Sequence, residues 1–187
     1  MLRVISGTVG GQKLKTLRGL ETRPTADRVR EALFNVLNPR IPKCRFLDLY
    51  AGTGAIGIEA LSRGADQVVF IDVNPAAVQV IRENLSRMQL LDRAEVICAK
   101  LPRGLELVAA RGYKFELVFV DPPYWNSLGE PTLNKLSFNN LLAAEGWVVL
   151  ETAAKEQPLP TSVGGLECFR QKRYGDTRLS YFSSLNI

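Results

Sequence analysis

Leu47-Asp48-Leu49-Tyr50-Ala51-Gly52-Thr53-Gly54-Ala55-Ile56-Gly57 begins as an apolar strand and ends as the first turn of a helix. Its three glycines let the backbone turn tightly and let a ligand approach the helix N-terminus. Their spacing is the G-x-G-x-x-G pattern of dinucleotide-binding folds. Asp72 ends the next apolar run, about 20 residues further on, where that pattern places a carboxylate for ribose hydroxyls. The stretch therefore predicts a strand–turn–helix unit that binds a ligand containing a ribose.

From residue 45 onward, apolar strands alternate with helical segments. We expect strands near 45–50, 67–72, 94–98, 115–120 and 147–151, and helices near 54–63, 75–88, 102–110 and 130–143. Gly64 and Gly146 are expected to end two of the helices. This alternation predicts an α/β fold with a doubly wound, mostly parallel sheet. The tail differs, because 166–173 and 177–184 flank Gly175-Asp176 and predict an antiparallel hairpin.

The residues before 45 predict a small extension. Residues 2–6 and 12–17 read as two strands around Gly10-Gly11, hence a β-hairpin. A helix is expected over 26–38, with Thr25 as its N-cap. Its apolar stripe is formed by Val29, Leu33, Val36 and Leu37. We therefore divide the chain into a hairpin extension, 1–22, and a main domain, 23–187.

The positive charge is concentrated in the N-terminal part. Residues 1–45 hold ten basic and three acidic residues, a net charge of +7, whereas the remainder holds 14 basic and 16 acidic residues, a net charge of −2. A basic extension on a nearly neutral body indicates a polyanionic partner, although a merely basic surface would show the same count. The residues expected to contact that partner are Lys13, Lys15, Arg23 and Arg28.

Composition excludes several classes of protein. The chain has no histidine, which excludes Ser-His-Asp hydrolysis and the common histidine metal sites, and we expect no metal. Three widely separated cysteines form neither a disulfide framework nor a zinc spacing. No apolar run is long enough to span a membrane, and no signal peptide is evident, so a cytoplasmic protein is expected. No apolar stripe is left over for an interface, so a monomer is expected.

Asp48 helps to identify the ligand of the glycine loop. A dinucleotide would place its pyrophosphate beside this carboxylate, which would repel it. S-adenosylmethionine carries an ammonium and a sulfonium group instead, and a carboxylate attracts both. The residues thus favour S-adenosylmethionine, with a nicotinamide oxidoreductase as the alternative.

A second motif, Asp121-Pro122-Pro123-Tyr124, follows the strand at 115–120. Two prolines hold a rigid turn whose carbonyl groups remain free as acceptors. An amine with two hydrogens could donate one to the Asp121 carboxylate and one to the Pro122 carbonyl, which would aim its lone pair at a methyl donor. Tyr124 offers a face on which a base could stack. We therefore expect Asp121, Pro122 and Tyr124 to be the catalytic residues.

The combined motifs resemble the RsmD family of bacterial 16S ribosomal RNA guanine-N2 methyltransferases. The resemblance rests on the segments 3–7, 22–25, 29–34 and 59–65, the Asp121-Pro122-Pro123-Tyr124 motif, and Glu151. It implies a Rossmann-like class I methyltransferase with a seven-stranded sheet and S-adenosylmethionine as the cofactor. It also implies that the cofactor lies against Asp48, Tyr50, Ala51, Gly52, Gly54 and Asp72. Methyltransferases of this class often carry an aspartate near position 100 that binds the adenine amine. This chain has Lys100 there, which cannot accept that hydrogen bond, so no adenine contact is assigned.

The resemblance implies that the partner is 16S ribosomal RNA or a small-subunit particle. In the implied reaction, the guanine amine loses its proton to Asp121 or to water, and the residues leave that choice open. Methylation of a DNA adenine or a protein glutamine is an alternative with the same chemistry. A non-catalytic RNA-binding assembly factor is a further alternative, which the presence of both Asp48 and Asp121 disfavours. Glu151, Trp125 and Arg63 are interpreted as structural.

Overall fold

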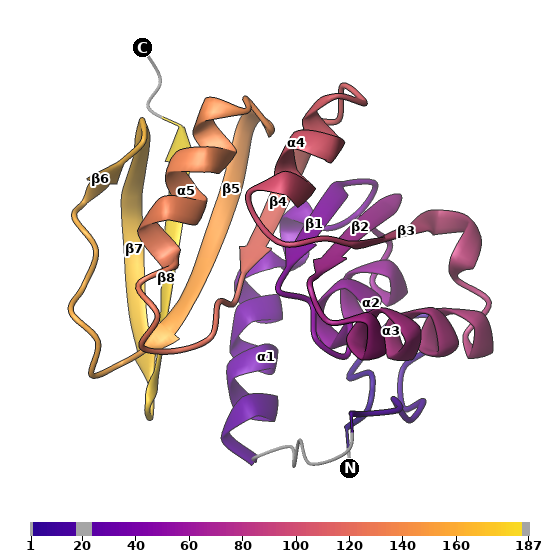
Figure 1. Ribbon diagram of the computed structural model, residues 1–187. Coiled ribbons are helices and arrows are strands. Elements are labelled where there is room, and N and C mark those ends of the chain that lie inside the picture. Colours follow the sequence, from indigo (N-terminus) through magenta and orange to yellow (C-terminus); the bar gives the residue numbers. More distant parts are fainter. Residues whose placement is uncertain (1, 18–23, 185–187) are drawn as a thin grey trace.

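One mixed sheet runs through the protein (Figure 1), seen in a computed structural model that describes residues 2–17 and 24–184. Its strand order is β3-β2-β1-β4-β5-β8-β7-β6. The parallel strands are β1 (Arg45–Leu49), β2 (Gln67–Asp72), β3 (Ala94–Cys98), β4 (Phe115–Val120) and β5 (Leu142–Ala153). The antiparallel strands are β6 (Ser162–Val163), β7 (Leu166–Tyr174) and β8 (Thr177–Ser184). The predicted α/β fold with a closing antiparallel hairpin is confirmed.

Helices cover both faces of the sheet (Figure 1). Side chains alternate between the faces along each strand, so each face carries apolar side chains that pack against helices. One core joins Phe46, Phe70 and Phe119 to α1 (Pro24–Leu37), α2 (Ala55–Ser62) and α3 (Pro75–Arg87). The other core joins Leu47, Ile71 and Val118 to α4 (Arg103–Ala109) and α5 (Gly129–Phe138). Short 3-10 turns, η1 (Asn38–Arg40) and η2 (Leu91–Arg93), complete the helices. None of the described helices is long and apolar enough to cross a lipid bilayer.

The strand order reverses between β1 and β4. The chain runs outward from β1 through β2 to β3 and then returns to the other side of β1 with β4. Because the register pairs Leu49 with Val120, the loop after β1 and the turn after β4 leave the sheet side by side. Ligands of open α/β sheets bind beyond the carboxyl ends of the strands at such a reversal. The topology therefore brings both sequence motifs to one place.

Several boundaries differ from the sequence-based expectation. Over residues 2–17 and 24–184 the sheet has eight strands rather than seven, because Gly164 and Gly165, with φ of 58° and 82°, turn the two-residue strand β6 onto β7. Helix α5 ends at Phe138 rather than near 143. Asn140, just beyond this end, adopts a φ of 50°. Strand β5 therefore begins at Leu142, and Gly146 lies inside this strand instead of ending a helix. Gly64, with a φ of 103°, follows α2 as expected.

Within residues 2–17, the N-terminal hairpin forms a single bridge, between Arg3 and Lys13, rather than two regular strands. The reason is that its amide groups bond to α2. Glu59, fully buried, accepts from Ile5 N–H at 2.6 Å and Ser6 N–H at 3.0 Å, and from Arg63 Nε at 2.7 Å. The apolar residues of the segment join the same core as α1, α2 and α3; they are Leu2, Val4, Val9 and Leu14.

Helix α1 begins at Pro24, so Thr25 lies within the helix and is not its N-cap. Proline suits the first helical position, because the amide hydrogen that it lacks would have no partner there. Three residues of the predicted apolar stripe, Val29, Leu33 and Leu37, are buried, and Val36 packs partly buried against them.

Replacing Glu59 by alanine should lower the free energy of unfolding by about 2–4 kcal/mol, because this fully buried carboxylate is the acceptor for two partly buried amides and for Arg63. Urea unfolding followed by circular dichroism measures this. Glu83→Ala is the matched control, because it removes an exposed carboxylate whose contact with the extension is its ion pair with Lys15. Equal stability of the two variants would contradict the role of Glu59 as an anchor of the extension.

Candidate functional site

The glycine loop joins β1 to α2 through a left-handed backbone. Tyr50, Gly52 and Gly54 have φ of 59°, 54° and 74°. A side chain on Gly54 would lie 3.0 Å from Ile81 Cγ1 of α3, so both the conformation and the space favour glycine there. Ala51 N–H donates to the Ile71 carbonyl at 3.1 Å, and Gly54 N–H donates to the Ala51 carbonyl at 2.7 Å. These bonds hold the loop closed against β2.

Asp48 lies beneath this loop and is only 2% exposed. Its Oδ2 accepts from Gly57 N–H at 2.9 Å, which satisfies an amide in the first turn of α2. Burial, reinforced by the charge of Asp72, raises the pKa of Asp48 to about 8, against the effect of the Gly57 hydrogen bond. The site thus holds a carboxyl group that ionises with difficulty when no cation is near.

Asp72, at the end of β2, lies against the glycine loop. Its Oδ2 accepts from Gly52 N–H at 2.8 Å, and its Oδ1 accepts from Asn74 N–H at 2.8 Å. Each oxygen keeps a second lone pair for a ligand. The side chain of Tyr50 bonds elsewhere, with its hydroxyl 2.9 Å from Thr132 Oγ1 of α5. Tyr50 therefore ties the loop to α5.

The Asp-Pro-Pro-Tyr turn follows β4 beside the loop. Asp121 N–H donates to the Leu49 carbonyl at 3.4 Å, and Pro122 is buried. Tyr124, 38% exposed, donates its hydroxyl to Glu151 Oε1 at 2.8 Å. Glu151 lies on β5, the next strand of the sheet, and the sequence had suggested only a structural role for it. The turn is thus held between β1 and β5.

Four carboxyl groups gather near the carboxyl ends of the neighbouring strands β2, β1, β4 and β5; they belong to Asp72, Asp48, Asp121 and Glu151, in that order. Burial, then the charges of Glu151 and Asp48, raise the pKa of Asp121, and burial raises the pKa of Glu151. Their mutual repulsion would be relieved by a ligand that carries positive charge or hydrogen-bond donors. No group of three or more acidic, histidine or cysteine side chains in the described residues could hold a metal ion.

Comparison with known proteins identifies the family of this chain. The family model described as Conserved hypothetical protein 95 matches residues 2–183. The chain belongs to this family. It is the RsmD family that the sequence motifs indicated.

Two relatives and one solved structure illustrate the likeness. The chain is 38% identical to a Bacillus subtilis protein named Putative rRNA methyltransferase YlbH, over 97% of this chain and 98% of that protein. It is 37% identical to Ribosomal RNA small subunit methyltransferase D of Escherichia coli K12, over 93% of this chain and 85% of that protein. A structure titled Putative methyltransferase yhhF from Escherichia coli superposes with a TM-score of 0.85 at 37% identity, covering 98% of this chain and 97% of that one.

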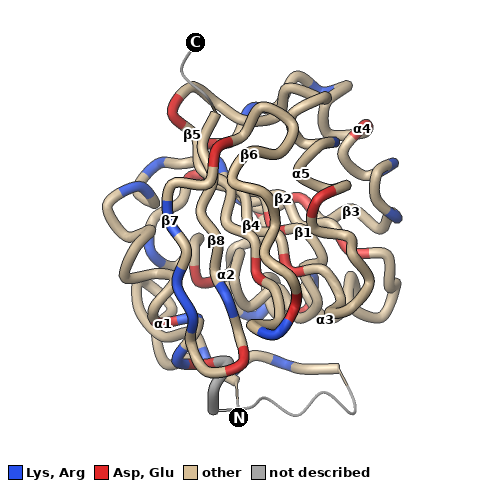
Figure 2. The backbone as a smooth tube through the Cα atoms, turned by 90° about the vertical axis from the view of Figure 1, so that its left-hand side faces the viewer, with Lys and Arg blue, Asp and Glu red and all other residues tan. Residues whose placement is uncertain are grey.

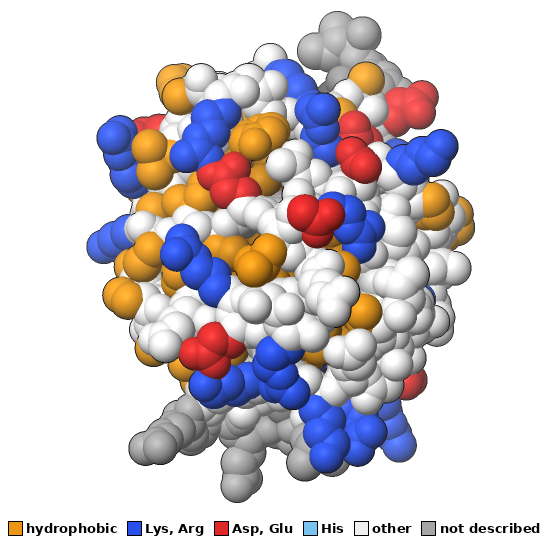
Figure 3. Space-filling model, turned by 90° about the vertical axis from the view of Figure 1, so that its right-hand side faces the viewer, with side chains coloured by type: hydrophobic (Ala, Val, Ile, Leu, Met, Phe, Trp, Pro, Cys, Tyr) orange, Lys and Arg blue, Asp and Glu red, His pale blue; other side chains and the backbone are white. Residues whose placement is uncertain are grey.

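The basic residues expected to bind RNA are distributed unevenly in this RsmD-family chain. Lys13 and Lys15 are exposed on either side of buried Leu14, and Lys15 forms an ion pair with Glu83 of α3. Arg28 is exposed near the start of α1, and Arg23 lies outside the described residues. The face over α3 and β3 carries both charges, with basic side chains gathered at its lower margin (Figure 3).

Asn84 of α3 links the N-terminal segment to the glycine loop. This residue is fully buried. Its Oδ1 accepts from Lys15 N–H at 2.8 Å, while its Nδ2 donates to the carbonyls of Lys15 at 3.0 Å and Thr53 at 3.2 Å. Nothing in the sequence marked Asn84, because an asparagine inside a helical segment carries no specific signal. The contact places Lys15 close to the candidate cofactor site.

A second group of basic residues could not be recognised from the sequence. Lys172 and Arg173 are exposed near the end of β7, and Arg178 lies near the start of β8. The register of Ala153 with Thr177 places this hairpin tip at the carboxyl end of β5, the edge that holds the carboxylates. Figure 2 shows basic residues along β7, on the side opposite to that of Figure 3. A charge count over the whole remainder of the chain conceals this cluster.

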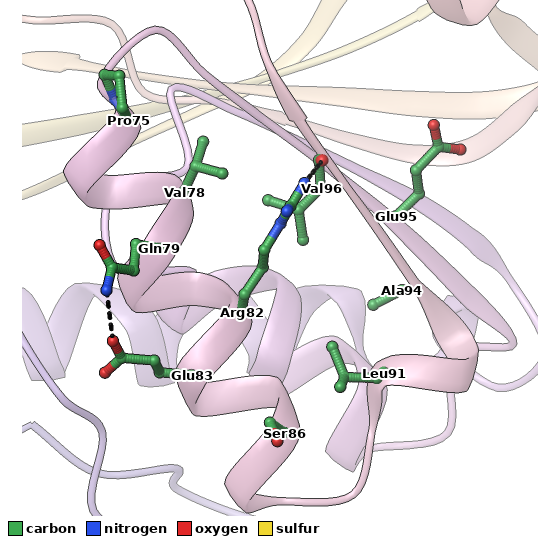
Figure 4. Close-up of a pocket in the computed structure, with 10 residues that line it drawn as sticks. All are labelled: Pro75, Val78, Gln79, Arg82, Glu83, Ser86, Leu91, Ala94, Glu95 and Val96. Carbon is green, nitrogen blue, oxygen red and sulfur yellow. Dashed lines mark hydrogen bonds between the residues drawn. The ribbon is translucent and has the colours of Figure 1, made fainter.

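A hollow of about 810 Å³ lies elsewhere, between α3 and β3. Figure 4 shows that Arg82 crosses it to the Val96 carbonyl, at 3.1 Å, while Gln79 bonds to Glu83 at 3.1 Å. The hollow is wide open, and neither the glycine loop nor the Asp-Pro-Pro-Tyr turn lines it. The chemistry-bearing residues therefore do not lie in this hollow.

Asp48→Asn should stabilise the ligand-free protein in a pH-dependent way. The pKa of Asp48 is raised on folding, so the folded state binds the proton more tightly and stability falls as pH rises from about 4 to about 8. Asparagine keeps an acceptor for Gly57 and removes this cost. The variant's gain in unfolding free energy over the wild type should grow across that window, to about 2–5 kcal/mol. Thermal unfolding at several pH values measures it.

Asp66→Asn, at an exposed position, is the control for the removal of one carboxylate. It should leave the pH dependence of stability unchanged. A difference between Asp48→Asn and the wild type that stays constant with pH would show that ionising Asp48 costs the fold nothing.

Proposed function

We propose that this protein transfers the methyl group of S-adenosylmethionine to the exocyclic N2 amine of a guanine in 16S ribosomal RNA. The observation that carries the proposal is the meeting of the glycine loop and the Asp-Pro-Pro-Tyr turn at the strand reversal, with carboxyl groups on both sides. The relatives named as rRNA methyltransferases, of nearly equal length, support the same reaction.

The residues of the loop fit S-adenosylmethionine. The bound cofactor supplies an activated methyl group on a sulfonium centre. Asp48 attracts the positive charge of the methionine part from beneath the loop, and Ala51, Gly52 and Gly54 let that part approach the backbone. The free lone pairs of Asp72 accept from the ribose hydroxyls. Val73, 59% exposed beside Asp72, offers an apolar surface for the adenine.

The residues of the turn fit a planar amine. Asp121 accepts one hydrogen of the amine, and the carbonyl of Pro122 accepts the other, which turns the nitrogen lone pair toward the methyl donor. Tyr124 supplies the stacking face for a base that has left its stack. Formation of the N2–CH₃ bond would break the bond between the methyl carbon and the sulfonium sulfur, which would leave as a neutral thioether, and the amine would lose one N–H proton. The raised pKa of Asp121 makes this carboxylate a competent acceptor for that proton.

Small-subunit ribosomal RNA, or a particle that contains it, is the proposed partner, and the cytoplasm the proposed location. We propose a monomer as the active form. Lys13, Lys15, Arg23 and Arg28 are the proposed contacts to the RNA backbone. A DNA adenine, a protein glutamine, or a purely RNA-binding role would give different products or none, so product analysis separates these alternatives from the proposal.

Asp121→Ala should leave S-adenosylmethionine affinity nearly intact and lower turnover by about a hundredfold or more, because Asp121 acts mainly in the transition state. Asp72→Ala should do the reverse, weakening cofactor binding by about 1–3 kcal/mol while turnover recovers at saturating cofactor. Calorimetry gives the affinities. Methylation of small-subunit particles from cells that lack this gene gives the rates, and mass spectrometry of the nucleosides identifies the product.

The two variants control for each other, since each removes one carboxylate from the same edge. Loss of cofactor binding in Asp121→Ala would place this residue in the cofactor site. Wild-type turnover of Asp121→Ala, or a product other than N2-methylguanosine from the wild type, would refute the proposed function.

Neutralising Lys13, Lys15, Arg23 and Arg28 together should weaken RNA binding and flatten its salt dependence. The slope of log affinity against log salt should fall by about 0.7–0.9 for each phosphate that the variant no longer neutralises. Cofactor affinity should not change. Filter binding of 16S ribosomal RNA at several salt concentrations measures the slope.

The matched control neutralises Lys43, Arg45, Arg111 and Lys114, which lie near the opposite sheet edge, where β1 and β4 begin and beyond the end of α4. It changes the net charge equally. If both quadruple variants give the same slope, the extension does not hold the RNA.

A further inference from the structure

Glu151 is placed to share the base pocket with Asp121. Strands β4 and β5 run parallel, and their register pairs Val120 with Leu150. The next residues along the two strands are Asp121 and Glu151, so they stand side by side at a spacing of about 4.8 Å between strands. Phe119 and Val149, two residues earlier, both face the core of α1, α2 and α3. Asp121 and Glu151 therefore leave the sheet toward the same face.

One oxygen of Glu151 is committed and the other is free for a ligand. Oε1 accepts the Tyr124 hydroxyl at 2.8 Å. In the hydrogen bonds among the described residues, Oε2 takes no part. The bond to Oε1 also fixes the Tyr124 ring, which is the proposed stacking face for the base. A base lying on that ring would have its edge directed at the two neighbouring carboxyl groups.

The two carboxyl groups are complementary to the hydrogen-bonding edge of guanine but not to that of adenine. Guanine presents two adjacent donors, the N2 amine and N1–H. Adenine presents its N6 amine next to N1, which is an acceptor without a hydrogen. The donors of the guanine edge favour the ionised form of both carboxyl groups, against the effect of burial. Ionised carboxylates only accept hydrogen bonds, so a pair of them binds the guanine edge and repels the adenine N1.

We propose that Glu151 accepts the N1–H of the target guanine while Asp121 accepts the N2 amine, and that Glu151 thereby selects guanine over adenine. This assignment rests on the proposed function, because it uses the same pocket and the same base. Glu151 is a specificity-determining residue in this scheme, and it does not exchange a proton with the reacting amine. A site built to bond a donor rejects analogues that lack this donor far more strongly than it rejects small differences in apolar shape.

The test replaces the target guanine by 2-aminopurine, which keeps the 2-amine but has an acceptor at N1. Mass spectrometry first maps the guanine that the wild type methylates in small-subunit particles. Particles are then reassembled with RNA that carries guanine or 2-aminopurine at that position. The wild type should methylate guanine RNA with a kcat/KM at least about tenfold higher. Glu151→Gln, whose amide can donate to an N1 acceptor, should reduce this preference at least about tenfold, mainly by slowing guanine.

Tyr124→Phe is the control, because it removes the hydroxyl that Glu151 binds but leaves the carboxylate and the stacking ring. It should lower both rates and retain the preference for guanine. If Glu151→Gln lowers both rates by the same factor, Glu151 acts only on the fold or on Tyr124, and the assignment is overturned. If that variant proves inactive or unstable, Glu151→Ala, which also removes the acceptor for N1–H, takes its place and should likewise reduce the preference for guanine. Equal methylation of the two bases by the wild type would show that nothing reads N1–H.

Failure of the proposed function looks different from failure of this assignment. A wild type that methylates no guanine in the particles refutes the proposed function before any base is replaced. A wild type that forms N2-methylguanosine but does not discriminate at N1 leaves the function intact and removes Glu151 from base selection.

Discussion

The hydrogen bond from Gly57 N–H to the buried carboxylate of Asp48 joins the first strand of the sheet to the first turn of α2. It fixes where the chain must leave β1, and the residues between them have to complete a tight left-handed loop. Because Leu49 pairs with Val120, the glycine loop that follows β1 lies beside the turn that follows β4. By fixing where the chain leaves β1, the same bond also fixes which residues lie next to that turn. Burial of this carboxyl group, with Asp72 close by, has an electrostatic cost that the bond offsets only in part. A structure that maintains this arrangement is prepared for a positively charged ligand.

The sequence was sufficient to predict the elements of the fold that follow a clear period or a glycine signal. The strands of the parallel sheet other than β5, the closing hairpin and helices α2 to α4 lie within a few residues of their predicted positions. It was insufficient where tertiary contacts replace local pairing. The amides of Ile5 and Ser6 bond to Glu59, a partner more than fifty residues away, and two residues of β6 are too few to show alternation. The limits of α5 were wrong for a similar reason, because Leu142 is drawn into β5 beside Phe115.

The residues of the candidate site divide in the same way, into those that a local pattern predicts and those that only tertiary contacts reveal. Asp48, Asp72 and Asp121 could be selected because each occupies a fixed place relative to a strand end. The importance of Glu151 could not be seen from its own segment, since it depends on the register of β5 with β4 and on a hydroxyl from the turn. Asn84 is a comparable case, because its partners Lys15 and Thr53 lie 69 and 31 residues away. Long-range partners of this kind give polar residues their roles without leaving a local pattern.

Asn84 and Glu59 also explain how a basic extension can serve a site lined with acids. The extension is bonded through Glu59 to α2 and through Asn84 to α3 and the glycine loop, so the backbone of Lys15 is held close to that loop rather than on an independent arm. The β7–β8 tip brings Lys172 and Arg173 to the same sheet edge. Positive side chains on the rim attract a phosphate backbone, whereas the carboxyl groups inside repel phosphate and accept hydrogen bonds from an amine. A nucleotide is therefore favoured with its phosphates outside and its base inside, which is the orientation that methylation of an exocyclic amine requires.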